Sequence, residues 1–302
     1  MDDHVLSVPT RWEGVYGEAI ALALAASAAW GIGMTAATPS IRYVDRLTYL
    51  VVRWGLVAAF AAIYALSTRH FAVPALEPAL WALVAGLVDA TAGGFFYLLA
   101  LERTSTYQAT TLSNTAPLWG VFGAVLLLGE PLRWSAAAAA GLVIMGSFFL
   151  VRRSADGRRG ISGLVLALLT GILWGVAETV PAKLALEQGL PPETLLFLFA
   201  CAGCGGALAL LPFLRRRTPV RVEAKGFLYV ALSGVVGAGV GWLLWLFSLE
   251  RAPASVVAPV RGATLVFCLI YSVVFLRERP SLRALVGIAF AAGAVLLVSF
   301  GS

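Results

Sequence analysis

Long apolar runs alternate with short polar segments along this chain of 302 residues. A helix that crosses the hydrocarbon core of a bilayer needs about 20 mostly apolar residues. Segments of that kind occupy residues 17–37, 47–66, 79–101, 105–128, 134–151, 161–182, 193–213, 226–249, 253–276 and 282–300. The pattern therefore predicts an all-α integral membrane protein with ten transmembrane helices.

Short motifs recur along the chain and divide it into two halves. Leu101-Glu102-Arg103 ends the third predicted helix, and Leu249-Glu250-Arg251 ends the eighth. Trp30-Gly31 in the first predicted helix matches Trp174-Gly175 in the sixth. We therefore expect one five-helix repeat at residues 1–155 and a second at 156–302. Because five is odd, the second repeat enters the bilayer in the opposite direction, and such inverted repeats are typical of transporters.

Composition and charge support the same class of protein. Only 13% of the residues are charged, against about 25% in typical soluble domains. The net charge of +6 comes from short basic runs between apolar segments, so it indicates membrane topology rather than nucleic-acid binding. Loops on the side of the two termini hold five Lys or Arg residues and those on the other side hold fifteen. Since basic loops face the cytoplasm, this count places both termini outside.

Several kinds of chemistry have no support in the sequence. The three cysteines lie inside apolar segments without neighbouring metal ligands, so neither a disulfide framework nor a metal site is expected. His4 and His70 both fall outside the predicted helices, which argues against an intramembrane Ser-His protease. A nucleotide-binding Gly-x4-Gly-Lys-Ser/Thr loop is absent, and the acidic N-terminal region does not resemble a signal peptide. No cofactor and no enzymatic activity are expected.

The order of these motifs resembles the drug/metabolite transporter superfamily, specifically its ten-span EamA-type branch. The residues that carry the resemblance are Trp30-Gly31, Arg53, Tyr97 to Leu101, Pro117, Gly129-Glu130, Trp174-Gly175, Trp245 to Leu249 and Glu278. The second half departs from the pattern because Leu265 stands opposite Pro117 and Arg277-Glu278 opposite Gly129-Glu130. The resemblance implies two inverted five-helix repeats that move small metabolites. It also implies cytoplasmic termini, so the orientation stays open.

Two carboxyl groups inside the predicted helices are candidates for function. An ionisable group at the centre of a membrane helix costs at least about 2.5–3.5 kcal/mol, so such groups are functional candidates by default. Asp89, in the middle of the third helix, could carry a proton, receive a substrate amine, or bond a neighbouring helix. Glu178 follows Trp174 on the same face of the sixth helix. Lys183 either pairs with Glu178 or extends to the membrane interface.

Two arginines also lie inside the predicted helices. Arg261 could hold a carboxylate or phosphate of the substrate in a fork of two hydrogen bonds, or it could neutralise Asp89 or Glu178. Arg53 is interpreted as structural, bonding carbonyl groups or a loop acid.

Four aromatic residues occupy equivalent positions in the two halves. Trp30 corresponds to Trp174, and Tyr97 corresponds to Trp245. We expect these rings to wall a central cavity suited to apolar or cationic solutes, with ordinary packing as the alternative. Asn114 precedes Pro117 in the fourth helix, where a proline frees a backbone carbonyl, so a polar site is expected there.

These features predict a secondary transporter that works by alternating access around a midplane cavity. Both signs of charge in the cavity suit a zwitterionic or aromatic solute such as an amino acid, and export across a bacterial-type inner membrane is favoured. The expected partners are the small-molecule substrate, the lipid bilayer and protons, and a monomer would suffice. The alternatives are a broad drug/metabolite efflux carrier and a lipid-modifying intramembrane enzyme that uses Glu178 and Lys183.

Overall fold

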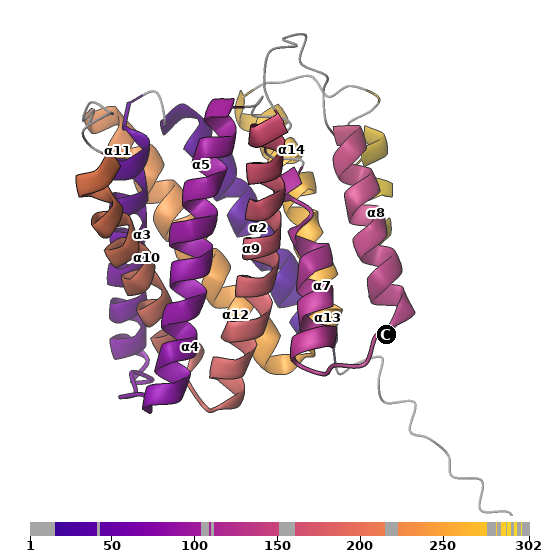
Figure 1. Ribbon diagram of the computed structural model, residues 1–302, viewed down its shortest axis with the longest axis horizontal. Helices are drawn as coiled ribbons and strands as arrows, with labels where there is room; N and C mark the ends of the chain where they lie inside the picture. The colour runs from indigo at the N-terminus through magenta and orange to yellow at the C-terminus, as the bar shows by residue number, and fades with distance from the viewer. Residues whose placement is uncertain are drawn as a thin grey trace, which may run out of the picture.

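A computed structural model of the protein describes residues 16–40, 43–103, 109, 112–150, 161–214, 223–276 and parts of 282–297. These residues form helices joined by short loops, and the helices stand side by side in one bundle (Figure 1). In the first half they are α2 (Gly17–Ser40), α3 (Arg46–Ser67), α4 (Leu76–Gly86), η1 (Leu87–Gly93), α5 (Gly94–Arg103), α7 (Ala116–Leu127) and α8 (Trp134–Leu150). In the second half they are α9 (Ile161–Glu187), α10 (Pro192–Leu214), α11 (Ala224–Ala231), η3 (Leu232–Val240), α12 (Gly241–Arg251), α13 (Ala254–Val257), η4 (Ala258–Ala263) and α14 (Thr264–Leu276).

The helices coincide with the predicted apolar segments over the described parts of the chain. Seven helical stretches there are long and apolar enough to cross a membrane, whereas α7 and α8 are shorter apolar helices. Residues 285–287 and 289–290 of the predicted tenth helix are helical, but most of the segment 282–300 lies outside the described residues. The linker at 152–159 and part of the fourth predicted helix also lie outside them. A helical, multi-pass membrane fold is therefore confirmed, and the number ten stays a prediction.

One helix in each half has a π-helical turn in its middle. The stretch α4–η1–α5 runs without a break from Leu76 to Arg103, and α11–η3–α12 runs from Ala224 to Arg251. The π-helical segment η1 ends eight residues before Leu101 of the repeated Leu-Glu-Arg motif, and η3 ends nine residues before Leu249. A π-turn makes hydrogen bonds to the fifth residue along the chain and is frequently found at functional sites.

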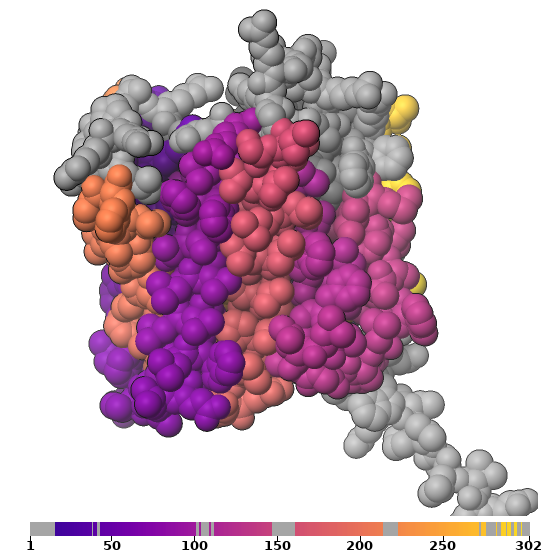
Figure 2. Space-filling view, viewed as in Figure 1, coloured from indigo at the N-terminus to yellow at the C-terminus, as the bar shows by residue number. Residues whose placement is uncertain are grey.

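Each half packs its first helix into the other half. The first-half helix α2 packs against η3, α12 and α14, while the second-half helix α9 packs against η1, α5 and α7. The helices α3 and α10, which are second in their halves, pack against each other. Figure 2 shows the result on one face, where α9 lies between the α4–α5 helix and α7.

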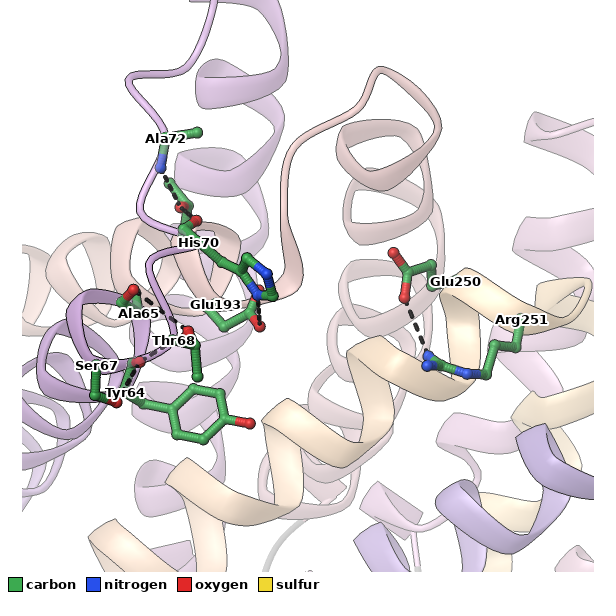
Figure 3. Close-up of polar contacts among 10 residues, drawn as sticks. Tyr64, Ala65, Ser67, Thr68, His70, Ala72, Glu193, Glu250 and Arg251 are labelled. Atoms are coloured by element: carbon green, nitrogen blue, oxygen red, sulfur yellow. Dashed lines mark hydrogen bonds and ion pairs between the residues drawn. The ribbon is translucent and has the colours of Figure 1, made fainter.

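Polar contacts join the helices at the end of the bundle where α3 ends and α10 begins. The His70 Nδ1 atom lies 3.2 Å from the Glu193 carboxylate, and the Ala72 N–H donates to the Thr194 hydroxyl over 3.2 Å. These bonds attach the α3–α4 loop to the first turn of α10 (Figure 3).

Two further contacts hold α13 and the end of α12 at the same end of the bundle. The Glu130 carboxylate accepts hydrogen bonds from the N–H groups of Ala254 and Ser255, both 2.8 Å long. The Lys183 ammonium donates to the Leu249 carbonyl over 2.5 Å and to the Ala252 carbonyl over 3.1 Å. Charged groups therefore satisfy the backbone on both sides of the break between α12 and α13.

Candidate functional site

A cavity of about 180 Å³ lies in the middle of the bundle. Its walls come from both halves, namely from α2, α3, η1, α5, α9, η3, α12, η4 and α14, together with Asn114 just before α7. The lining extends to Ala37 near the end of α2 and to Arg46 at the start of α3. The cavity thus reaches from the midplane towards the end of the bundle opposite the Glu130 and His70 contacts. It is smaller than the roughly 300–1,000 Å³ of a site for drug-sized ligands, so it suits a small solute.

Glu178 of α9 and Arg261 of η4 form an ion pair in the cavity wall. The Arg261 Nη2 atom donates to Glu178 Oε1 over 2.6 Å, and the Arg261 Nε atom faces Glu178 Oε2. Both side chains are nearly enclosed, with 5% of Glu178 and 12% of Arg261 exposed. The Arg261 guanidinium also lies 5.4 Å from the Trp30 ring and 6.0 Å from the Trp174 ring, so two indole faces stabilise its charge.

Asp89 is the second carboxylate in the cavity wall and comes from η1. It is buried, and it lies within the electrostatic influence of the Glu178 carboxyl group and of the Arg261 and Arg53 guanidinium groups. Its Oδ2 atom is buried without a hydrogen-bond partner among the described residues. Because an unmatched buried acceptor is costly, this oxygen is well placed to accept a hydrogen bond from a cation or proton donor in the cavity.

Two pairs of aromatic rings, at equivalent positions of the two halves, lie near the ion pair. The ring centroids of Tyr97 and Trp174 lie 5.3 Å apart, and those of the equivalent Trp245 and Trp30 lie 5.6 Å apart. Each tryptophan of the first helices also packs on a glycine of the opposite half. A Cβ atom at Gly93 would lie 2.6 Å from Trp174, and one at Gly241 would lie 2.6 Å from Trp30. The absence of side chains at these two positions lets the indoles reach the midplane.

The cavity brings together all but one of the predicted site residues. Those that line it are Trp30, Asp89, Tyr97, Asn114, Trp174, Glu178 and Arg261. Trp245 is fully buried behind them. Its indole N–H donates to the Glu178 carbonyl over 2.8 Å, so it supports the site without lining it. Lys183 bonds carbonyl groups near α13 rather than Glu178.

Sequence reasoning missed the contribution of α3 to the cavity. The lining residues of this helix are Arg46, Tyr49, Leu50, Arg53 and Trp54. Their spacing of three, four and seven residues places them on one helical face. This spacing is visible in the sequence, but the apolar residues around it hide which face turns inward.

Comparison with known proteins identifies the family. The EamA-like transporter family matches the chain twice, at residues 17–152 and 161–300. An uncharacterized transporter from Archaeoglobus fulgidus is 25% identical over 285 residues, which span 92% of this chain and 97% of the relative. A riboflavin transporter from Rhizobium johnstonii is 29% identical over 133 residues, covering 43% of this chain and 42% of the relative.

The fold is also similar to a solved structure. A crystal structure covers 92% of this chain and 95% of its own chain at 20% identity, with a TM-score of 0.77. At this identity the likeness concerns the fold alone. Since the family matches cover nearly the whole sequence, the chain belongs to the EamA-like transporter family of the drug/metabolite transporter superfamily.

Proposed function

We propose that the protein is a secondary transporter that exports a small zwitterionic or aromatic solute, such as an amino acid, across a bacterial inner membrane. The observation that carries this proposal is the placement of Asp89 beside the Glu178–Arg261 pair in a cavity walled by Trp30 and Trp174. Asp89 offers an acceptor for an amine, the guanidinium groups offer donors for a carboxylate, and the indole faces suit an apolar or aromatic side chain.

We propose alternating access between two inverted five-helix repeats, residues 1–155 and 156–302. The double family match at 17–152 and 161–300 supports this division. So does the exchange of α2 and α9 between the halves, because each first helix makes equivalent contacts in the opposite half. The cavity lies between the halves, where inverted-repeat transporters bind substrate.

Proton exchange is the coupling that we propose. The Glu178 carboxylate is paired with Arg261, and Asp89 lies close enough to Glu178 for the two carboxyl groups to influence each other electrostatically. Two carboxyl groups in such a site are most stable when they share a proton. A substrate amine that enters next to Asp89 would replace that proton, and the proton would return when the substrate leaves.

The alternative enzymatic function has less support from the site. A lipid-modifying reaction through Glu178 and Lys183 would need their side chains to act together. Instead, Glu178 is occupied by Arg261, and Lys183 is bonded to the carbonyls of Leu249 and Ala252.

Counterflow in proteoliposomes tests the proposal. Liposomes that contain the purified protein are loaded with unlabelled phenylalanine or leucine, and uptake of the labelled amino acid is measured. We expect uptake by the wild type and a loss of about 10- to 100-fold in Asp89→Asn and Arg261→Gln, because each change removes a charged hydrogen-bonding group. The matched control is Arg103→Gln, since Arg103 is exposed at the end of α5.

Two other results would contradict parts of the proposal. Counterflow of riboflavin or cationic drugs without counterflow of amino acids would indicate a broad efflux carrier. Amino-acid flux that persists unchanged in both cavity variants would show that Asp89 and Arg261 serve only the packing of the helices.

A further inference from the structure

Arg53 lies in the cavity wall without an ion pair to any described residue. Its Nε atom is buried and has no hydrogen-bond partner among the described residues. Its guanidinium lies 4.9 Å from the ring of the adjacent Trp54, a cation–π contact that uses none of the five N–H donors. The backbone at Arg53 packs closely on η3, since a Cβ atom at Gly234 would lie 3.2 Å from the Arg53 carbonyl oxygen. The side chain is therefore a cation in the cavity wall whose Nε donor is unused among the described residues.

The charges around the cavity leave a positive excess at this position. The lining contains Arg46, Arg53 and Arg261 against Asp89 and Glu178, which is three cations against two anions. Glu178 and Arg261 neutralise each other through their ion pair. Arg46 makes an interaction of its own. Among the described residues that line the cavity, Arg53 is therefore the arginine left available to a ligand, and it also lies in the electrostatic field of Asp89.

We infer that Arg53 is the residue that binds the anionic group of the substrate, while Asp89, which lines the same cavity, receives the amine. The planar guanidinium fork matches a carboxylate with two parallel hydrogen bonds. This assignment differs from a role for Arg261, whose donors already face Glu178. The inference rests on the proposed transport function and specifies the substrate class, namely small solutes that carry a carboxylate or a comparable anion.

Matched ligand pairs test the role of Arg53 directly. Phenylalanine and phenylalanine amide share the ring and the amine, but only phenylalanine has a carboxylate. Their dissociation constants are measured by titrating the tryptophan fluorescence of the purified full-length protein, for which Trp54 is an adjacent reporter. The variants are Arg53→Gln, Arg53→Lys and Arg261→Gln, with Arg103→Gln as the exposed control.

We expect the wild type and Arg103→Gln to bind phenylalanine more tightly than its amide. Arg53→Gln should weaken phenylalanine binding by about 10- to 100-fold and leave the amide unchanged, as expected for the loss of charged hydrogen bonds. Arg53→Lys should restore part of the preference because it keeps the charge without the fork. Gel filtration of each variant and the unchanged amide affinity together exclude misfolding as the cause.

Three outcomes would overturn the inference: equal weakening of both ligands in Arg53→Gln, a preference that disappears only in Arg261→Gln, or a wild type without preference for the anion. A second pair, phenylpropionate and phenylpropionamide, separates the inference from the proposed function because both lack the amine. If amino acids fail to bind but an Arg53-dependent preference for phenylpropionate is found, the anion site stands and the zwitterionic substrate is wrong.

Discussion

At the scale of single residues, the site depends on one buried ion pair. Glu178 and Arg261 are almost completely enclosed, so each supplies the charge that makes burial of the other tolerable. Removing one partner of a buried pair typically costs about 3–5 kcal/mol, because it leaves an uncompensated charge. Removing both costs less, since no isolated charge remains.

We therefore expect Glu178→Gln and Arg261→Gln each to lower the Tm in detergent, and the double variant to lower it by less than the sum of the two single shifts. Differential scanning fluorimetry of the two single variants and the double variant gives this comparison as a double-mutant cycle. Strictly additive shifts in Tm would show that the two residues act independently, contrary to the short contact between them.

The sequence could predict much of this site but not its internal pairing. Asp89, Glu178 and Arg261 stand out because charges inside apolar segments are costly, and all three line the cavity. The sequence does not show that Trp30 lines the cavity while Trp245 lies behind the lining residues. Both tryptophans stand at repeat-equivalent positions, and only their packing in the structure separates them. For Arg53 the sequence favours a structural role, because no pattern along the chain shows whether a partner lies opposite it.

At the scale of helices, two glycines set how close the halves approach. A methyl group at Gly93 would meet the Trp174 ring and disturb the bond from its indole N–H to the Asp89 carbonyl, which is 3.2 Å long. We expect Gly93→Ala and Gly241→Ala to destabilise the protein by about 1–3 kcal/mol, as overpacking generally does. Both variants should also reduce counterflow.

The control for these variants is Gly205→Ala in α10, where a Cβ atom would have nothing within 4 Å. Alanine favours a helix over glycine by about 1 kcal/mol, so this variant should keep or raise the Tm. An equal fall in Tm at all three positions would argue against a specific role of the tryptophan contacts.

Glu130 joins the α7–α8 loop to the first turn of α13. Its two carboxylate oxygens accept from two backbone N–H groups, whereas a glutamine offers only one acceptor oxygen. We expect Glu130→Gln to cost about 1.5–3 kcal/mol, the usual value for a hydrogen bond to a charged group. Thermal unfolding measures the loss. Glu250→Gln is the control, since the Glu250 side chain is 48% exposed, and an equal effect there would contradict the role of Glu130.

The hydrophobic pattern of the sequence predicts the helix boundaries, but it does not predict the π-helical segments. An apolar run of sufficient length fixes where a helix enters and leaves the bilayer, and α3 and α10 begin and end within one residue of their predicted limits. The π-helical segments η1 and η3 pack against α9 and α2, respectively, in the opposite half. Such contacts join residues far apart in the sequence, so the apolar pattern contains no sign of them.

At the scale of the whole molecule, the cavity extends to the end of the bundle where α2 ends and α3 begins. The lining reaches Ala37 and Arg46, and the loop between α2 and α3 belongs to the side with the larger number of Lys and Arg residues. If that side is cytoplasmic, as its charge indicates, the cavity faces the cytoplasm in this conformation. An exporter takes up its substrate from that side.

Cysteine labelling tests this orientation. Single cysteines replace Arg103 at the cavity end, Val73 at the opposite end, and Ala37 in the cavity wall, in a protein without its three native cysteines. With a membrane-impermeant maleimide, we expect Val73→Cys to react in intact cells and Arg103→Cys in inside-out vesicles. Ala37→Cys should react only in inside-out vesicles, and saturating substrate should slow it, because the substrate occupies the same cavity.

The reverse labelling pattern would establish the opposite orientation of the protein in the membrane. Reaction of Arg103→Cys in intact cells would place the basic loops outside and the termini in the cytoplasm, in agreement with the family resemblance and against the charge count. The cavity would then be open to the outside, and this conformation would be the one that releases an exported solute. Labelling of Ala37→Cys from that side, without protection by substrate, would argue that the cavity is not the binding site.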